Sequence, residues 1–398
     1  MIEEAWRILT FQAGFNTAVV VAGTAALGVA GGTVGTFLLL RRRALVSDAL
    51  SHATLPGIAA AFLVGVALGL PERSLPLLLA GAAVSGVLGV LLIQGLVRVT
   101  RLSEDSVIGA VLACSFGLGV VLLSHIQALQ VGGQAGLAHF ILGQTAAMRW
   151  GEAVAMGVLA LVAAGVVALL FKELRLIAFD AGFAQGQGWP VQRLDLALMG
   201  LATLVTVIGL QTVGLVLVVA LLIVPAVAAR FWTERLATMT VIAAALGGLS
   251  GWLGATLSAL FPRLPAGAVI VLVAGAFFLV SFLLAPARGL LAAALRFARL
   301  RLALAEQQAL RRLLVAGGGV SPAMAGWLRL KGYRRGDRLT PQGRAAARAA
   351  ERNRRLWERF LIEHAALAPA TPDWGIAPID RVLPADLVRL LEDRRRWR

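Results

Sequence analysis

The chain contains very little cysteine and few charged residues. Cys114 is the only cysteine among 398 residues, so an intrachain disulfide and a cluster of several thiolate metal ligands are both excluded. Charged residues make up 15% of the sequence and hydrophobic residues 59%, and the mean hydropathy is +0.83. A chain this apolar is not expected to be a soluble globular protein. We therefore expect a polytopic membrane protein.

Two motifs that would point to other classes of protein are also absent. The sequence has no G-x-x-x-x-G-K-[ST] segment that could hold nucleotide phosphates, so the chain is not expected to be an ATPase. The N-terminal segment MIEEAWRILTF lacks the basic region that begins a cleavable signal peptide. We expect the first apolar segment to remain as a membrane helix.

The charged residues that are present are concentrated near the C-terminus. Residues 286–398 hold 23 of the 37 Lys and Arg residues and 10 of the 21 Asp and Glu residues, and so carry +13 of the formal net charge of +16. This distribution predicts a transmembrane domain at residues 1–285 and a basic region after it. Within that region we expect a linker helix at 286–320 and a small cytoplasmic domain at 321–398.

Nine apolar segments approach the length of about 20 residues that a helix needs to cross a bilayer. They cover residues 16–40, 45–69, 75–97, 106–126, 150–171, 194–209, 213–230, 236–260 and 267–285. The sixth and seventh are short and separated only by Leu210–Thr212, so they could instead form a broken helix and a half-helix. The sequence therefore predicts an all-α bundle of eight or nine transmembrane helices.

Small residues recur along these spans, for example in Gly28–Gly32 and Gly247–Gly251. Small residues let membrane helices approach closely, which favours a tightly packed bundle. Gly and Ala are nevertheless common in any membrane protein.

Basic residues in the loops predict the orientation of the bundle. Ten of them fall on one side of the nine spans, namely Arg41, Arg42, Arg43, Arg98, Arg101, Lys172, Arg175, Arg193, Arg230 and Arg235. Four fall on the other side, namely Arg7, Arg73, Arg149 and Arg263. Positive residues favour the cytoplasm. We therefore expect the N-terminus outside a bacterial inner membrane and the C-terminus in the cytoplasm.

Two ionisable residues, Asp48 and His52, lie inside the second apolar span. Their four-residue spacing places both side chains on one face of a helix. Such residues are costly inside a membrane and mark a function by default, and a carboxylate with an imidazole suits a first-row divalent metal. Alternatively, Asp48 caps the helix and His52 is a satisfied polar residue near the interface. His125 and His139 are either further metal contacts or solvated loop residues.

The predicted cytoplasmic loop 172–193 is polar but keeps an apolar side. Asp180 can cap a short helix that runs to about Gln187, and Gly188 and Pro190 end it. This helix either docks a cytosolic partner or lies flat on the bilayer.

Three segments resemble the metal-ion ABC transporter permeases, which import manganese, zinc or iron(II). They read RRRALVSDALSHATLPGIAAAFLVG, FKELRLIAFDAGFAQGQGWPV and VGLVLVVALLIVPAVAARF. The segment GLAHFILGQTAAM is also similar, and the resemblance covers about residues 10–285. It implies a membrane-embedded metal site at Asp48 and His52. It also implies a coupling element that contains Phe179, Asp180, Ala184 and Gly188.

The same resemblance implies partners and a substrate. The permease is expected to be a homodimer or a pair of related chains, with two ATP-binding subunits on its cytoplasmic face. An extracytoplasmic metal-binding lipoprotein is expected to deliver the ion. Mn²⁺, Zn²⁺ or Fe²⁺ would be the transported substrate, with no permanently bound cofactor. An ATP-independent metal carrier is an alternative.

The tail resembles the metal-dependent repressors related to the diphtheria toxin repressor, through LTPQGRAAARAAERNRRLWERFLIEH and PIDRVLPADLVRLLE. We expect an Arg-rich helix at 287–315, a capped helix at Ser321–Lys331, a hairpin at Gly332–Leu339 and a helix from Pro341 to about Ala366. This order is typical of an α+β winged-helix module.

The tail also departs from those repressors. Arg354 stands where they have a histidine, and Gly375–Arg381 stands where they have further metal ligands. We therefore do not expect the tail to bind a regulatory metal. A permease anchored in the membrane gains little from reading DNA, so nucleic acid binding is not expected either, and a membrane-tethered metal-responsive DNA-binding regulator remains only an alternative. A module that contacts the ATPase, its sister tail or anionic lipid is the favoured interpretation.

Overall fold

The structure is a computed structural model that describes residues 7–8, 14–69, 75–129, 145, 148–261, 264–315, 319–363 and 378–393. The chain divides into two compact units, Met1–Leu290 and Leu291–Arg398. In the described residues the first unit is built from helices, whereas the second contains helices and a short two-stranded hairpin.

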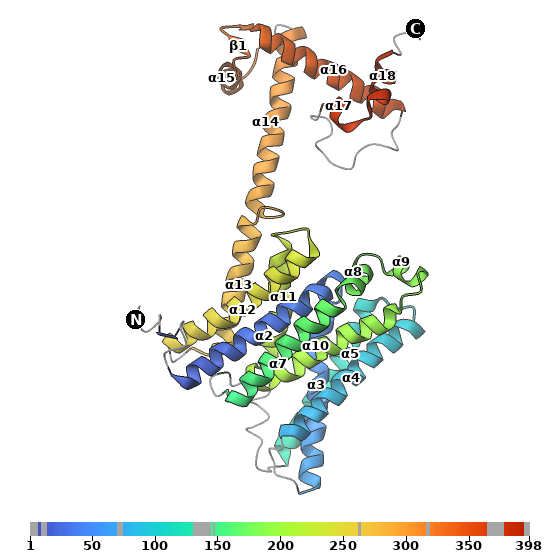
Figure 1. Ribbon diagram of the computed structural model, residues 1–398, viewed down its shortest axis with the longest axis vertical. Helices are drawn as coiled ribbons and strands as arrows, with labels where there is room; N and C mark the ends of the chain where they lie inside the picture. The colour runs from blue at the N-terminus through green and yellow to red at the C-terminus, as the bar shows by residue number, and fades with distance from the viewer. Residues whose placement is uncertain are drawn as a thin grey trace. The chain divides into compact units, whose positions relative to one another are not determined.

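Eight helices in the described part of the first unit are long and apolar enough to cross a membrane (Figure 1). They are α2 (Phe15–Leu40), α3 (Ala44–Ala67), α4 (Leu75–Val99), α5 (Glu104–Ala128), α7 (Trp150–Leu169), α10 (Val191–Val213), α12 (Leu236–Leu260) and α13 (Ala266–Leu284). The shorter helices of this unit are α8 (Phe171–Phe179), α9 (Ala181–Gly186) and α11 (Leu215–Arg230). The predicted polytopic helical bundle is therefore confirmed.

The two closely spaced apolar segments form one complete span and one short helix. α10 extends beyond the predicted residue 209, and the chain then breaks at Gly214, whose φ of +84° favours glycine. The chain turns back there, because Gly209 of α10 lies against Val218 of α11. α11 has 16 residues and is about 24 Å long, which is shorter than a hydrocarbon core of about 30 Å.

The two glycine-rich segments pack against each other, which confirms the close helix approach that small residues predict. α2 and α12 run antiparallel, so that Gly28 faces Gly247 and Gly32 faces Ala243. A methyl group added at Gly28 would overlap the carbonyl of Gly247. At the same interface the hydroxyl of Thr24 donates to the carbonyl of Gly251 at 3.1 Å. The contact therefore depends on the absence of side chains at these positions.

Helix contacts also show which helix ends lie together. Leu39 and Leu40 at the end of α2 pack with Ala229 of α11 and Met239 of α12. A cavity of about 170 Å³ brings together the start of α3, the end of α4 and the starts of α5 and α10. The basic loops beside these helices therefore share one end of the bundle. That this end faces the cytoplasm stays a prediction.

The second unit follows the predicted order of elements. They are α14 (Leu290–Val315), α15 (Pro322–Leu330), β1 (Arg334–Arg335), β2 (Arg338–Leu339), α16 (Pro341–Glu363), α17 (Ile379–Val382) and α18 (Ala385–Asp393). The strands pair antiparallel, with Arg334 opposite Leu339. Ser321 occupies the predicted cap position of α15 but makes no side-chain capping hydrogen bond. Ala309 and Leu310 of α14 contribute to the core of this unit together with Leu328.

The α2–α12 contact predicts a sharp difference between two glycine substitutions. Gly28→Ala should lower the free energy of unfolding by about 1–3 kcal/mol, because the added methyl group forces the helices apart. Gly157→Ala on α7 is the matched control, since no atom would lie within 4 Å of the new Cβ. The control should be neutral or slightly stabilising. Thermal unfolding in detergent measures both, and equal stability of the two variants would contradict the interpretation.

Candidate metal site

Asp48 and His52 lie on successive turns near the start of α3. At a rise of 1.5 Å per residue they are about 6 Å and about 12 Å along the helix axis from its first residue. His52 Nε2 and Asp48 Oδ1 are 3.6 Å apart, slightly beyond hydrogen-bond distance. The four-residue spacing therefore brings the two side chains together, as the sequence predicts.

An aromatic contact orients His52. Its ring meets the Phe116 ring of α5 edge to face, with centroids 5.0 Å apart. The Nδ1 atom is buried and has no hydrogen-bond partner within the described part of the chain. The alternative that His52 is a satisfied polar residue stays a prediction. Asp48 is not the N-cap of α3, because Arg43 occupies that position.

The spacing of the two atoms suits shared coordination of one ion. A metal about 2.1 Å from both Nε2 and Oδ1 would subtend an angle of about 120°, close to tetrahedral geometry. Two protein ligands are fewer than the four usual at a closed zinc site. Among the described residues no group of three or more His, Cys, Asp and Glu side chains could hold a metal. Asp48 and His52 alone would therefore offer an ion only two ligands.

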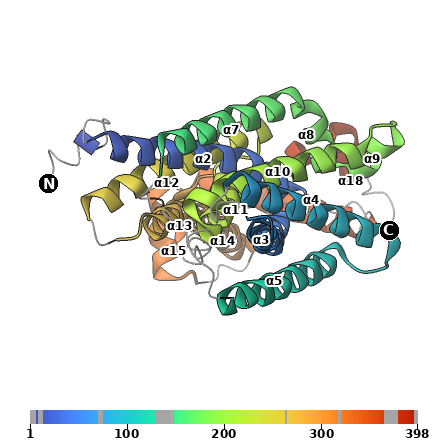
Figure 2. The same cartoon turned by 90° about the horizontal axis from the view of Figure 1, so that it is seen from below.

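Figure 2 looks nearly along α3, which lies among α4, α5, α10 and α11. Ser51 and Thr54, which are fully buried, each donate a hydrogen bond to their own helix, to the carbonyls of Ser47 and Ser51 respectively. Asp48 and His52 are more open, with side chains 39% and 20% exposed. On this part of α3, the polar side chains that an ion could reach are therefore those of Asp48 and His52.

An ion-pair cluster, which sequence analysis did not identify, holds the turn before α3. Asp195 at the start of α10 accepts two hydrogen bonds from Arg41, at 3.0 and 2.6 Å. Arg43 Nη1 lies 3.3 Å from the same carboxylate, and Arg43 Nε lies 2.6 Å from Glu104 of α5. Asp195 is buried. The available signal was an acidic residue near the start of a span that begins beside a basic loop, namely Glu104 in the first turn of α5 and Asp195 just after the first turn of α10.

The same turn contacts the helix that precedes the predicted coupling element. Arg41 Nη1 donates to the carbonyl of Ile177 in α8 at 2.8 Å. Arg42 adopts a left-handed conformation, with φ of +59°, which is uncommon for a residue other than glycine. The connection between α2 and α3 is therefore tight and tied to both α8 and α10.

The predicted short helix in the 172–193 loop is α9. Asp180 Oδ1 accepts a hydrogen bond from the Phe183 N–H at 2.8 Å, and Gly188 ends the segment with φ of +82°. The predicted cap and the predicted end are therefore confirmed. Ala184 is fully buried, whereas Phe179, Phe183 and Trp189 are exposed. Asp180 and Gly188 shape the element, Ala184 packs it, and the three aromatic side chains form its outer surface.

Of the two further histidines, His125 is exposed on the last turn of α5. His139 lies outside the described residues, as does most of the similar segment at 136–148. Their contribution to metal binding stays a prediction.

The ion-pair cluster predicts a large effect of one neutral substitution. Asp195→Asn should lower the free energy of unfolding by about 3 kcal/mol, because it leaves Arg41 and Arg43 poorly compensated in a buried place. Asp105→Asn removes an exposed carboxylate on α5 and should change stability by less than about 0.5 kcal/mol. Thermal unfolding in detergent compares them. An Asp195→Asn protein as stable as the control would show that the ion pairs of Asp195 with Arg41 and Arg43 do not stabilise the fold.

Comparison with known proteins identifies the family of the chain. Residues 15–285 match the ABC 3 transport family. The chain is 42% identical over 310 residues to the manganese transport system membrane protein MntC of Bacillus subtilis, covering 78% of this chain and 69% of that protein. It is 43% identical over 272 residues to the zinc transport system membrane protein TroC of Treponema pallidum, covering 68% of this chain and 90% of that protein.

A solved structure, PsaBC from Streptococcus pneumoniae in complex with Fab, has a TM-score of 0.61 and 29% identity, and covers 76% of this chain and all of that one. A second, an inward-facing conformation of a metal-chelate type ABC transporter, has a TM-score of 0.52 at 16% identity and supports the fold alone. The family match extends over more than half of the sequence. The chain therefore belongs to the ABC 3 transport family and is a multi-pass transport subunit rather than an enzyme.

Proposed function

We propose that this chain is the permease subunit of an ABC importer for Mn²⁺ or Zn²⁺, and that Asp48 and His52 bind the ion on its route. The observation that carries the proposal is the carboxylate–imidazole pair, 3.6 Å apart on a membrane helix. The named relatives support manganese or zinc, whereas iron(II) rests on the sequence resemblance alone. Family membership favours import driven by a partner ATPase over an ATP-independent carrier or a membrane-tethered regulator.

A second permease chain would complete the coordination shell. Two copies together offer two carboxylates and two imidazoles, a ligand set suited to Mn²⁺ or Zn²⁺. Asp48 is 39% exposed in the single chain, so its oxygens are open to an ion shared with another subunit. A homodimer, or a pair of related permeases, is therefore part of the proposal.

The two ends of the bundle would serve different partners. The end with the basic loops would face the cytoplasm of a bacterial cell, where an ATP-binding subunit would contact the aromatic surface of Phe179, Phe183 and Trp189. The opposite end would receive the ion from an extracytoplasmic metal-binding lipoprotein. In this orientation the N-terminus is outside and the C-terminus is cytoplasmic.

The Asp195 cluster would couple movements that ATP hydrolysis causes in the partner subunit to the position of Asp48 and His52. A movement of α9 displaces the start of α10, which carries Asp195. Asp195 pairs with Arg41 and Arg43, and Arg43 immediately precedes α3. A displacement of this turn shifts the first part of α3 and with it Asp48 and His52. Release of the ion toward the cytoplasm follows from that shift.

For the C-terminal region we propose a winged-helix-like module that does not sense metal. The order of α15, the β1–β2 hairpin and α16 supports it. Arg354, which stands where the similar repressors have a histidine, pairs with Glu351 and Glu358. A guanidinium group is not a metal ligand, so the module is better suited to contacts with proteins or lipids.

Substitution of the two ligands tests the metal route. Asp48→Asn and His52→Ala should each reduce uptake of radioactive Mn²⁺ or Zn²⁺ at least about tenfold, because each removes a ligand from an already small set. Uptake is measured in cells that express the chain with its ATP-binding subunit, and Asp105→Asn is the matched control. Co-purification of the ATP-binding subunit with each variant excludes misfolding. Normal uptake by either ligand variant would show that the ion is transported without binding at Asp48 and His52.

Substitution on α9 tests the docking surface separately. Phe183→Ala should abolish co-purification of the ATP-binding subunit, because it removes a large exposed apolar side chain from the centre of the contact. Gln185→Ala, on the same helix and also exposed, is the control and should retain the partner. Both variants should unfold at the temperature of the wild type. Retention of the partner by Phe183→Ala would show that the partner docks elsewhere.

A further inference from the structure

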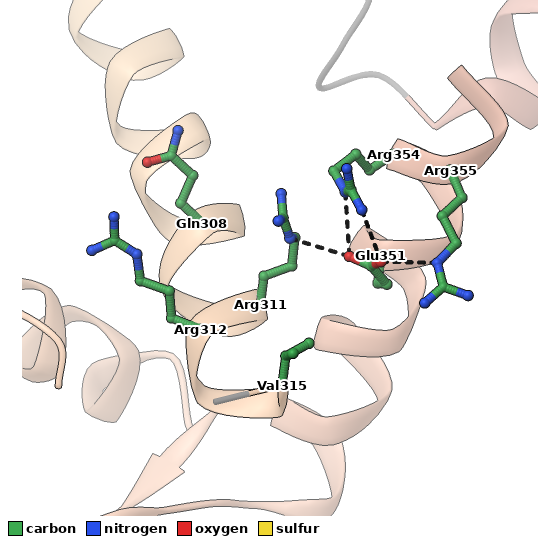
Figure 3. A pocket seen from close by; sticks show the side chains of 7 residues that line it. All are labelled: Gln308, Arg311, Arg312, Val315, Glu351, Arg354 and Arg355. Carbon is green, nitrogen blue, oxygen red and sulfur yellow. Dashed lines mark hydrogen bonds and ion pairs between the residues drawn. The ribbon is translucent and has the colours of Figure 1, made fainter. Parts of the chain in front are cut away.

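The second unit contains a cleft lined mainly by arginine. It lies between α14 and α16, has a volume of about 540 Å³ and is formed by Gln308, Arg311, Arg312, Val315, Glu351, Arg354 and Arg355 (Figure 3). Four arginines against one glutamate leave the lining with a formal charge of +3. The volume is within the usual range for small-molecule sites. The charge indicates that any ligand must be an anion.

Glu351 brings the guanidinium groups together. Arg311 reaches it from α14 at 3.1 Å, while Arg354 and Arg355 reach it from α16 at 3.1 and 2.9 Å (Figure 3). The hydrogen bond from Arg354 is the main cause of the lowered pKa of Glu351, against an opposing effect of burial. The carboxylate therefore stays ionised and fixes three cations around one point.

These contacts leave much of the hydrogen-bonding capacity of the arginines unused. Arg311 and Arg355 each approach Glu351 through Nε, so this contact uses one of the five N–H donors of each guanidinium group. The side chains of Arg311 and Arg355 are 39% and 67% exposed. Arg312 adds a further positive charge to the lining. A network that served stability alone would not need these additional cations.

Guanidinium groups match the geometry of phosphate oxygens, because two parallel N–H groups can donate to two oxygens at once. Glu358, outside the lining, offsets one of these charges through its ion pair with Arg354, and the remaining +2 is better balanced by two negative charges than by one. We propose that this cleft binds a phosphate group with at least two negative charges, carried by a soluble phosphorylated molecule or by the headgroup of an anionic lipid. The site would be separate from the metal route in the membrane unit.

Pyrophosphate is the probe for the soluble source. Isothermal titration of the purified full-length chain in detergent, in a metal-free buffer of low ionic strength, should show binding. Arg311→Ala and Arg355→Gln should weaken it about tenfold or more, because each removes charge-assisted hydrogen bonds. Arg338→Gln on β2 loses the same charge outside the cleft and should bind as the wild type does. If Arg311→Ala fails to fold, the binding of pyrophosphate by Arg355→Gln, at a more exposed residue, tests the proposal by itself.

Short-chain phosphatidic acid is the probe for the lipid source, with phosphatidylcholine of the same chain length as its control. Binding of both pyrophosphate and phosphatidic acid would show that the phosphate group itself is recognised. Binding of only one would identify the source while supporting the site, provided that the cleft variants weaken it. Two results would overturn the proposal, namely binding of neither probe, or equal weakening by Arg338→Gln and the cleft variants.

Discussion

The buried carboxylate of Asp195 holds the turn that leads into α3, the helix that carries the proposed metal site. It pairs with Arg41 and Arg43, and Arg43 also meets Glu104, so two cations and two carboxylates balance in a place where an unpaired charge would be costly. The cluster connects the end of α2, the start of α3 and the starts of α5 and α10. Because α3 begins immediately after Arg43, the position of Asp48 and His52 follows from this balance. The same cluster lies beside α8 and thus near the helix proposed to dock the ATPase.

The bundle has a tightly packed side and a more open side. α2 is the most deeply buried of the spans in the described residues, through its contacts with α12, α7 and α11, whereas α5 is among the least buried. α3 lies between them, and its Asp48–His52 face is directed toward α5 and Phe116. The proposed ion site at this boundary would have closely packed helices on one side and a more exposed surface on the other. Such a position suits a site that a second subunit completes and that must open and close.

The sequence predicted the features that depend on local spacing. The lengths of the apolar segments located the spans to within a few residues. The four-residue separation of Asp48 and His52 placed their side chains next to each other. The cap at Asp180 and the end at Gly188 followed from local turn chemistry. Arg41 and Asp195 are 154 residues apart, so their pairing follows only from how α2 and α10 pack. For the same reason the Phe116 contact of His52 and the arginine cleft between α14 and α16 required the three-dimensional structure.

The most direct test of ion binding by Asp48 and His52 is pulsed electron paramagnetic resonance of Mn²⁺ bound to the full-length chain in complex with its ATP-binding subunit. A directly coordinated imidazole gives a nitrogen modulation, which should be present in the wild type and in His125→Ala and absent in His52→Ala. Mn²⁺ that retains the same nitrogen modulation in the His52→Ala complex would contradict binding at this site.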